Sequence, residues 1–275
     1  MKSNLFYRVI TGFLFVPALV YIAREGNIPF LVLIELGIFI SSYEFYAILE
    51  AKGLHPYKSL GIVASVILGL TAYTASYIFT LTTVTVLFIV LSISELMRID
   101  PDRAIFHMST THFGVIYTGW LFSHLILLRE IPAHIGGDYG VGLSYAMLPF
   151  VIAWTGDTFA FFVGSRFGRH KMLERVSPAK SWEGAIGGGL AAIGALFIMR
   201  SLYAPYLSVI DTVILGFFGY AAGVVGDLVE SLLKRDANLK DVSTSIPGHG
   251  GVLDRFDSIL FTAPLVYYYL RFFVV

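Results

Sequence analysis

The sequence predicts an all-α, polytopic integral membrane protein with about nine transmembrane helices, and three observations lead to that fold class. Hydrophobic residues make up 56% of the chain and charged residues 14%, whereas soluble domains usually carry about 25% charged residues. Apolar segments recur along the sequence at the length that a bilayer core about 30 Å thick requires, which is about 20 residues per helix. Lysine and arginine also fall unevenly between these segments.

The chain divides into nine apolar segments, each long enough for one membrane-spanning helix. No Ala-x-Ala-like cleavage site follows the first, so we interpret it as a span rather than a signal peptide. The boundary between the third and fourth depends only on Thr80, Thr82 and Thr83. His124 interrupts the fifth, which predicts a tilted or short span. The expected spans are residues 6–23, 28–49, 59–79, 81–97, 111–128, 143–164, 184–203, 208–233 and 253–274.

The basic residues predict the orientation. With nine spans, fifteen lysines and arginines lie on the N-terminal side of the membrane, and the other side has four: Arg24, Arg129, Arg200 and Arg271. Positively charged loops usually remain in the cytoplasm. We therefore expect a cytoplasmic N-terminus, an external C-terminus and a location in the inner (cytoplasmic) membrane. The two longest polar connections, 165–183 and 234–252, then both face the cytoplasm.

The composition of the chain limits the kinds of binding partner and metal site that we expect, and we also expect the chain to have two parts. Zero net charge gives no indication of a nucleic-acid partner. The absence of cysteine excludes disulfides and thiolate metal sites. We expect two parts: residues 1–140, N-terminal helices that anchor the chain and shape a lipid entrance, and residues 141–275, a catalytic transmembrane domain.

Carboxylates inside a membrane are costly and are usually functional or paired. Two of them, Glu44 and Asp211, lie near predicted span ends, where snorkelling toward the surface or a misplaced span boundary explains them. Glu35 lies in mid-span without an evident partner, so a structural hydrogen bond and a function are both open. The six candidates are Glu35, Glu44, Asp157, Asp211, Asp227 and Glu230.

The carboxylates Asp157 and Asp227 differ from the others, because each follows a glycine and precedes a basic loop. Asp227 also begins a polar stripe, since Glu230, Ser231 and Lys234 follow it at helical spacings of three, four and seven. An ion pair at the end of a helix is one interpretation. A polar stripe that enters the bilayer from a charged loop more often lines a water-filled site, which is the interpretation that we favour.

Small residues have a packing explanation. Gly184 with Gly188, and Gly219 with Gly223, have the four-residue spacing that lets helices approach closely. Phosphate binding by Gly187, Gly188 and Gly189 is the weaker alternative, because these residues lie in an apolar segment.

The segment 247–257 combines groups suited to phosphate chemistry. Gly250 and Gly251 permit turns whose N–H groups bind anions. Asp254 and Asp257 can lie on one helical face, and with Asp227 they offer the oxygen ligands that Mg²⁺ prefers. Nearby cations suited to phosphate oxygens are Lys234, Arg235, Lys240 and Arg255. The combination is typical of metal-assisted phosphoryl or nucleotidyl transfer. His249 could be a general base, a phosphate donor or a loop-packing residue.

The polar segments resemble the signature of the phosphatidate cytidylyltransferases, also called CDP-diacylglycerol synthases. The residues that carry the resemblance are Ser231, Lys234, Arg235, Lys240, Asp241, Ser243, Ile246, Pro247, the run His249 to Val252 and the run Asp254 to Asp257. A second region, with Asp157, Phe161, Gly164 and residues 177–184, is also similar to the family. Ala179 and Ser181 stand there where the family pattern has lysine and threonine. The resemblance covers residues 150–260.

The resemblance implies an all-α, dimeric membrane enzyme that transfers CMP from CTP to phosphatidate. The products are CDP-diacylglycerol, a precursor in phospholipid biosynthesis, and pyrophosphate. It implies Mg²⁺ held by Asp227 and Asp254, with a second cation as an open alternative. The expected catalytic residues are Asp227, Lys234, Lys240, His249, Asp254 and Asp257. The expected substrate-binding residues are Asp157, Ser177, Lys180, Ser181, Ser231, Arg235, Gly250, Gly251 and Arg255.

Two rival functions stay open at this point. A CTP-dependent lipid kinase would use similar groups but would release CDP instead of pyrophosphate. A cation-coupled transporter could use Asp157 and Asp227 as an ion pathway. Transporters often show inverted repeats and sites near mid-bilayer, whereas here no clear repeat is visible and the polar residues collect near one membrane face.

Overall fold

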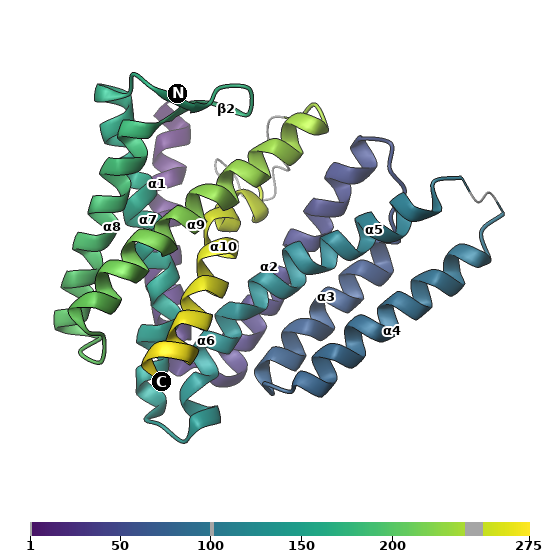
Figure 1. Cartoon of the computed structure of the whole chain (residues 1–275), viewed down its shortest axis with the longest axis horizontal. Coiled ribbons are helices and arrows are strands. Elements are labelled where there is room, and N and C mark those ends of the chain that lie inside the picture. Colours follow the sequence, from purple (N-terminus) through teal and green to yellow (C-terminus); the bar gives the residue numbers. More distant parts are fainter. Residues whose placement is uncertain (1, 100–101, 240–249) are drawn as a thin grey trace.

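A computed structural model describes residues 2–99, 102–239 and 250–275, and within them the protein is a bundle of helices with one short β-hairpin (Figure 1). The N-terminal helices are α1 (Lys2–Glu25), α2 (Asn27–Ala51), α3 (Lys58–Tyr73), α4 (Tyr77–Leu96), α5 (Ala104–Gly114) and α6 (Leu121–Ile135), with the π-helical turn η1 (Val115–Trp120) joining the last two. The rest comprises η2 (Tyr139–Val141), α7 (Gly142–Phe167), β1 (Lys171–Leu173), β2 (Ser177–Ser181), α8 (Trp182–Leu202), α9 (Val209–Asp236), α10 (Leu253–Tyr269) and the π-helical η3 (Leu270–Val274).

The predicted fold class is confirmed: this is an all-α polytopic membrane protein. Six helical segments among the described residues are long and apolar enough to cross a membrane. They are α2, α4, the continuous helix 104–135, the segment 139–167, α8 and α9. Each of the nine expected spans overlaps a helix, and α3 is a shorter apolar one. The count of nine membrane crossings stays a prediction.

One predicted helix boundary is wrong, and the expectation that His124 shortens the fifth span is wrong for the same physical reason; a tilt of that span stays a prediction. The break between the third and fourth helices lies at residues 74–76, not at the threonines 80–83. Thr80 and Thr83 lie inside α4 and donate their hydroxyls to backbone carbonyls four residues earlier. His124 likewise contacts the carbonyl of Trp120 through Nδ1 at 2.8 Å, within a helix that runs on to Ile135. A polar side chain that bonds to its own helix need not end it.

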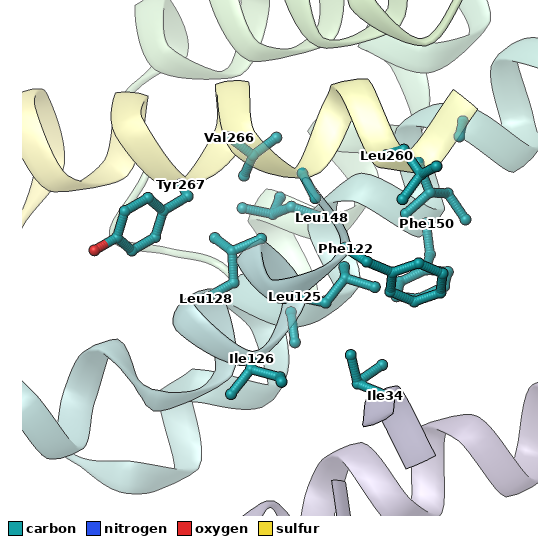
Figure 2. Packing of buried hydrophobic residues seen from close by; sticks show 14 of the residues in the cluster. Ile34, Phe122, Leu125, Ile126, Leu128, Leu148, Phe150, Leu260, Val266 and Tyr267 are labelled. Atoms are coloured by element: carbon teal, nitrogen blue, oxygen red, sulfur yellow. The ribbon is translucent and has the colours of Figure 1, made fainter. Parts of the chain in front are cut away.

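Helix α6 lies at the centre of the apolar core. Figure 2 shows Phe122, Leu125 and Leu128 of α6 facing Leu260 and Val266 of α10, with α7 and α2 adding their side chains around them. α10 therefore packs against both the N-terminal helices and the C-terminal ones. Its position matters because its first turns carry Asp254 and Asp257.

The C-terminal helices α7, α8, α9 and α10 pack against one another (Figure 1). Glycines permit the close approach of these helices, as the spacing predicted. A Cβ atom at Gly184 would lie 2.8 Å from the carbonyl oxygen of Ala160 on α7. At Gly223 it would lie 2.9 Å from the hydroxyl of Thr262 on α10. The β-hairpin lies at the same end of the molecule as the start of α1, and the C-terminus lies at the opposite end.

Substitution Gly188→Ala is expected to lower stability. Its methyl group would overlap the hydroxyl of Tyr220 on α9 and would lie 2.6 Å from the carbonyl oxygen of Gly156 on α7. Overpacking of this kind typically costs about 1–3 kcal/mol, so the melting temperature of the detergent-solubilised protein should fall. Gly194→Ala on the same helix is the matched control, because nothing lies within 4 Å of its Cβ position. Equal melting temperatures for the two variants would disprove this packing.

Candidate active site

A polar cavity of about 360 Å³ opens among α7, the hairpin, the start of α8, α9 and α10. Four aspartates line it, and they come from three helices. Among the described residues, Lys180 is the one lysine or arginine that lines it. The described lining residues are Asp157, Ala160, Phe161, Met172, Ser177, Ala179, Lys180, Ser181, Gly184, Ala185, Tyr220, Val224, Asp227, Asp254 and Asp257. The two segments that the sequence analysis singled out, one around residue 180 and one around residues 227–257, thus meet at one cavity.

The aspartates are oriented by neighbouring hydroxyl and backbone groups. Ser231 donates its hydroxyl to Asp227 at 3.3 Å, which confirms that these two residues share a helical face. Ser258 donates its hydroxyl to Asp157 at 3.2 Å and its backbone N–H to Asp257 at 2.6 Å. Asp257 lies within electrostatic reach of both Asp227 and Asp157. Three like charges in one cavity repel each other, so the site is suited to a bound cation.

Two lysines neutralise part of this negative charge. Lys180 of the hairpin forms an ion pair with Asp227 at 2.6 Å. Lys234 lies between Glu230 at 2.6 Å and Asp254 at 2.7 Å. Glu230 is 1% exposed, and its second carboxylate oxygen has no hydrogen-bond partner within the described ranges. Lys234 therefore joins α9 to α10 beneath the cavity.

The loop 165–183 completes the site as an antiparallel β-hairpin. From the sequence, this segment was predicted only to be a basic loop. Arg235 near the end of α9 donates its Nε to the carbonyl of Val176 at 3.5 Å, which ties the hairpin to that helix. Ser181 ends the hairpin and caps α8, because its hydroxyl accepts the backbone N–H of Gly184 at 3.2 Å. These contacts hold Lys180 over Asp227.

Carboxylates accept the backbone N–H groups at the start of α10. Gly250 has a positive φ of 82°, a conformation that favours glycine. The N–H of Gly251 is donated to Asp254 at 2.8 Å. The next two, of Val252 and Leu253, are donated to Glu44 of α2 at 3.2 and 2.8 Å. An anion that bound the Gly251 amide would therefore have to displace a carboxylate.

The interpretation of Glu44 as a snorkelling residue was wrong. Glu44 is 2% exposed, and its carboxylate is directed into the protein toward α10. No spacing rule links residue 44 to residue 252, so sequence reasoning had no signal for this contact. The other carboxylate explained in that way, Asp211, forms a capping box with Ser208 at the start of α9.

The expected site residues do not all reach the cavity. Arg255 lines a separate apolar cavity of about 280 Å³, with residues of α1, α2, α6 and α7. Ser231 and Arg235 contact the site through Asp227 and the hairpin, respectively. Lys240 and His249 lie outside the described residues, so their roles stay predictions. Tyr220 and Met172 line the cavity and were not expected there.

The donor set can be tested against a divalent cation. In the part of the chain that the structure describes, no group of three or more Asp, Glu or His residues could hold a metal ion. Mg²⁺ often uses only one or two carboxylates, and it takes its remaining ligands from substrate phosphates and water. Asp227 and Asp254 line the same cavity, and Asp257 lies within electrostatic reach of Asp227. These carboxylates fit Mg²⁺ that binds together with a phosphate substrate.

Comparison with known proteins identifies the family of this chain. The family model described as "Cytidylyltransferase family" matches residues 6–273. The chain belongs to this cytidylyltransferase family. The match includes every element that lines the cavity, together with the N-terminal helices that the sequence resemblance did not cover.

Curated relatives span most of the chain. The phosphatidate cytidylyltransferase of Bacillus subtilis is 28% identical over 272 residues, which cover 97% of both chains. The phosphatidate cytidylyltransferase of Synechocystis is 32% identical over 274 residues, covering 89% of both chains. The chloroplastic phosphatidate cytidylyltransferase 4 of Arabidopsis thaliana is 34% identical over 273 residues, covering 91% of this chain and 69% of that protein.

Proposed function

We propose that this protein transfers CMP from CTP to phosphatidate and forms CDP-diacylglycerol and pyrophosphate. The observation that carries the proposal is the cavity in which four aspartates and Lys180 meet, with Lys234 joining two of its helices. Relatives that share most of this chain carry the name phosphatidate cytidylyltransferase. A cavity lined by four aspartates and Lys180, in a protein of apolar helices, suits a reaction between a nucleotide and a lipid phosphate.

The proposed reaction needs no covalent bond between the protein and either substrate. A phosphate oxygen of phosphatidate is already anionic, so it can attack the α-phosphorus of CTP without a strong base. The bond between the α- and β-phosphates breaks, and pyrophosphate leaves. In this proposal Lys180 and Lys234 neutralise phosphate oxygens. Lys180 lines the cavity and would exchange Asp227 for a substrate phosphate, and Lys234 would do the same with Asp254. Asp157 lines the cavity and accepts the hydroxyl of Ser258 on α10.

We further propose that Asp227 and Asp254 hold Mg²⁺, with Asp257 as an additional ligand. When bound, Mg²⁺ would offset the charge repulsion among the reacting phosphates. The four carboxylates in the cavity support this assignment.

The proposed setting is the inner membrane, with the cavity open to the cytoplasm. Support comes from the excess of lysine and arginine on the N-terminal side of the predicted spans. The hairpin lies at the same end of the molecule as the start of α1 (Figure 1), which agrees with this proposal. A homodimer is proposed from the family resemblance alone.

The proposed reaction is tested by its products. Purified protein given CTP, Mg²⁺ and phosphatidate should release pyrophosphate, and this release should stop when either phosphatidate or Mg²⁺ is omitted. Release of CDP in place of pyrophosphate would indicate the rival lipid kinase. Cation flux in proteoliposomes without CTP consumption would indicate the transporter.

A further inference from the structure

Glu44 connects the N-terminal helices to the catalytic cavity. It lies in α2, far from the cavity in sequence, and its side chain is 2% exposed. One carboxylate oxygen accepts the N–H of Val252 at 3.2 Å, and the other accepts the N–H of Leu253 at 2.8 Å. The carboxylate thus contacts two consecutive amides at the start of α10.

These amides have no helical partner of their own. The first N–H groups of any helix lack an intrahelical acceptor, and they favour a negative charge. Val252, at the N-cap position of α10, supplies no side-chain cap. Asp254 accepts the N–H of Gly251, and Glu44 accepts the next two. Two carboxylates, one local and one from α2, therefore fix the first turn of α10.

Gly251 has a steric reason to be glycine that agrees with this contact. A Cβ atom at this position would lie 2.7 Å from Oε2 of Glu44 and 3.0 Å from its Oε1. A side chain at position 251 would push the carboxylate away from the amides. Part of the glycine-rich sequence before α10 thus admits a carboxylate from another helix, which differs from the phosphate-binding role expected for it.

The turn that Glu44 fixes carries the site. Asp254 bonds to Lys234 in this turn, and Asp257 follows three residues later beside Asp227. A shift of the first turn would change the spacing of these aspartates from α9. Misplacement by about 1 Å can lower the rate of a reaction about a hundredfold.

We propose that Glu44 is a positioning residue of the catalytic cavity: it fixes the N-terminus of α10 and so sets the spacing of Asp254 and Asp257 from Asp227. This inference rests on the proposed function. It gives the N-terminal helices a part in the reaction beyond anchoring.

Glu44→Gln is the first test, because glutamine has the same size and creates no cavity. The glutamine carbonyl oxygen can accept only one of the two N–H groups of Val252 and Leu253. The glutamine NH₂ group would then face the other N–H, which it cannot accept. We expect kcat to fall about tenfold to a hundredfold, with little change in KM for CTP. The Mg²⁺ concentration for half-maximal activity should rise. Mn²⁺ binding to the protein in the presence of CTP and the absence of phosphatidate, followed by electron paramagnetic resonance, should weaken in parallel.

Glu35→Gln is the matched control. Glu35 lies on the same helix, and its carboxylate oxygens have no hydrogen-bond partner among the described residues. It should keep the kcat and the Mn²⁺ affinity of the unchanged protein. Gly251→Ala provides a second variant, since it displaces the same carboxylate. Its effect should not add to that of Glu44→Gln, because both remove one contact.

The outcomes separate the two proposals. Unchanged kcat and Mn²⁺ affinity in Glu44→Gln would overturn the positioning role. So would a loss of activity that is explained by a smaller folded fraction while Mn²⁺ affinity stays the same, or fully additive effects of the two variants. If the unchanged protein makes no pyrophosphate, the proposed function fails instead. The Mn²⁺ measurement would still decide whether Glu44 positions the carboxylates.

Discussion

Asp227→Asn is expected to lower kcat for CDP-diacylglycerol synthesis by roughly a thousandfold, which corresponds to about 4 kcal/mol of transition-state stabilisation. Asp227 lies where the hairpin, α9 and α10 meet, and it forms an ion pair with Lys180 at 2.6 Å. Asparagine keeps the size of the side chain but removes the charge that a cation and Lys180 require. Asp254→Asn should have an effect of similar size. Both losses are measured as pyrophosphate release from CTP and phosphatidate.

Asp236→Asn is the control for these variants. Asp236 also lies on α9, but it is exposed and forms an ion pair with Lys52 away from the cavity. Exposed ion pairs contribute about 0–1 kcal/mol, so its kcat should match that of the unchanged protein. Full activity in Asp227→Asn or Asp254→Asn would disprove the metal assignment.

Lys234→Met is expected to have the largest effect on stability. It leaves Glu230, which is 1% exposed, and Asp254 without their shared cation. Removing one partner of a buried ion pair typically costs about 3–5 kcal/mol. The melting temperature in detergent should fall clearly, and activity should be lost because the Asp254 carboxylate is no longer held.

The double variant Glu230→Gln with Lys234→Met separates stability from activity. Glu230→Gln removes the buried charge that Lys234→Met alone leaves without a partner, so the double variant should recover part of the lost melting temperature. It should stay inactive, because no lysine remains at position 234 to contact Asp254 or a substrate phosphate. A double variant that is as unstable as Lys234→Met would argue against the Glu230–Lys234 pair as the source of the loss.

The site was predictable from sequence wherever its residues follow local spacing. Asp227 and Ser231 are four apart on one helix, and the structure places them in contact. The pair Glu230 and Lys234 follows the same rule. Glycine spacing similarly predicted the close packing of α8 with its neighbours. These features need only the periodicity of the helix, which the sequence contains.

Features that depend on tertiary contacts were not predictable in this way. The contact of Glu44 with Val252 and Leu253 joins residues about 200 positions apart. The ion pair of Lys180 with Asp227 was not predicted, because the sequence indicated only that the loops 165–183 and 234–252 face the same side of the membrane. Arg255 is adjacent to Asp254 in sequence, but it points to a different cavity, because neighbouring residues on a helix face different directions.

The most direct measurement follows the phosphorus atoms of CTP. Purified protein is given phosphatidate and Mg²⁺ with CTP that is labelled at either the α- or the γ-phosphorus, and the lipid product is then extracted. Transfer of CMP places the α-label in the lipid and releases the γ-label as pyrophosphate, and the Asp227→Asn variant should give neither. A lipid that carries the γ-label would contradict nucleotidyl transfer at this cavity.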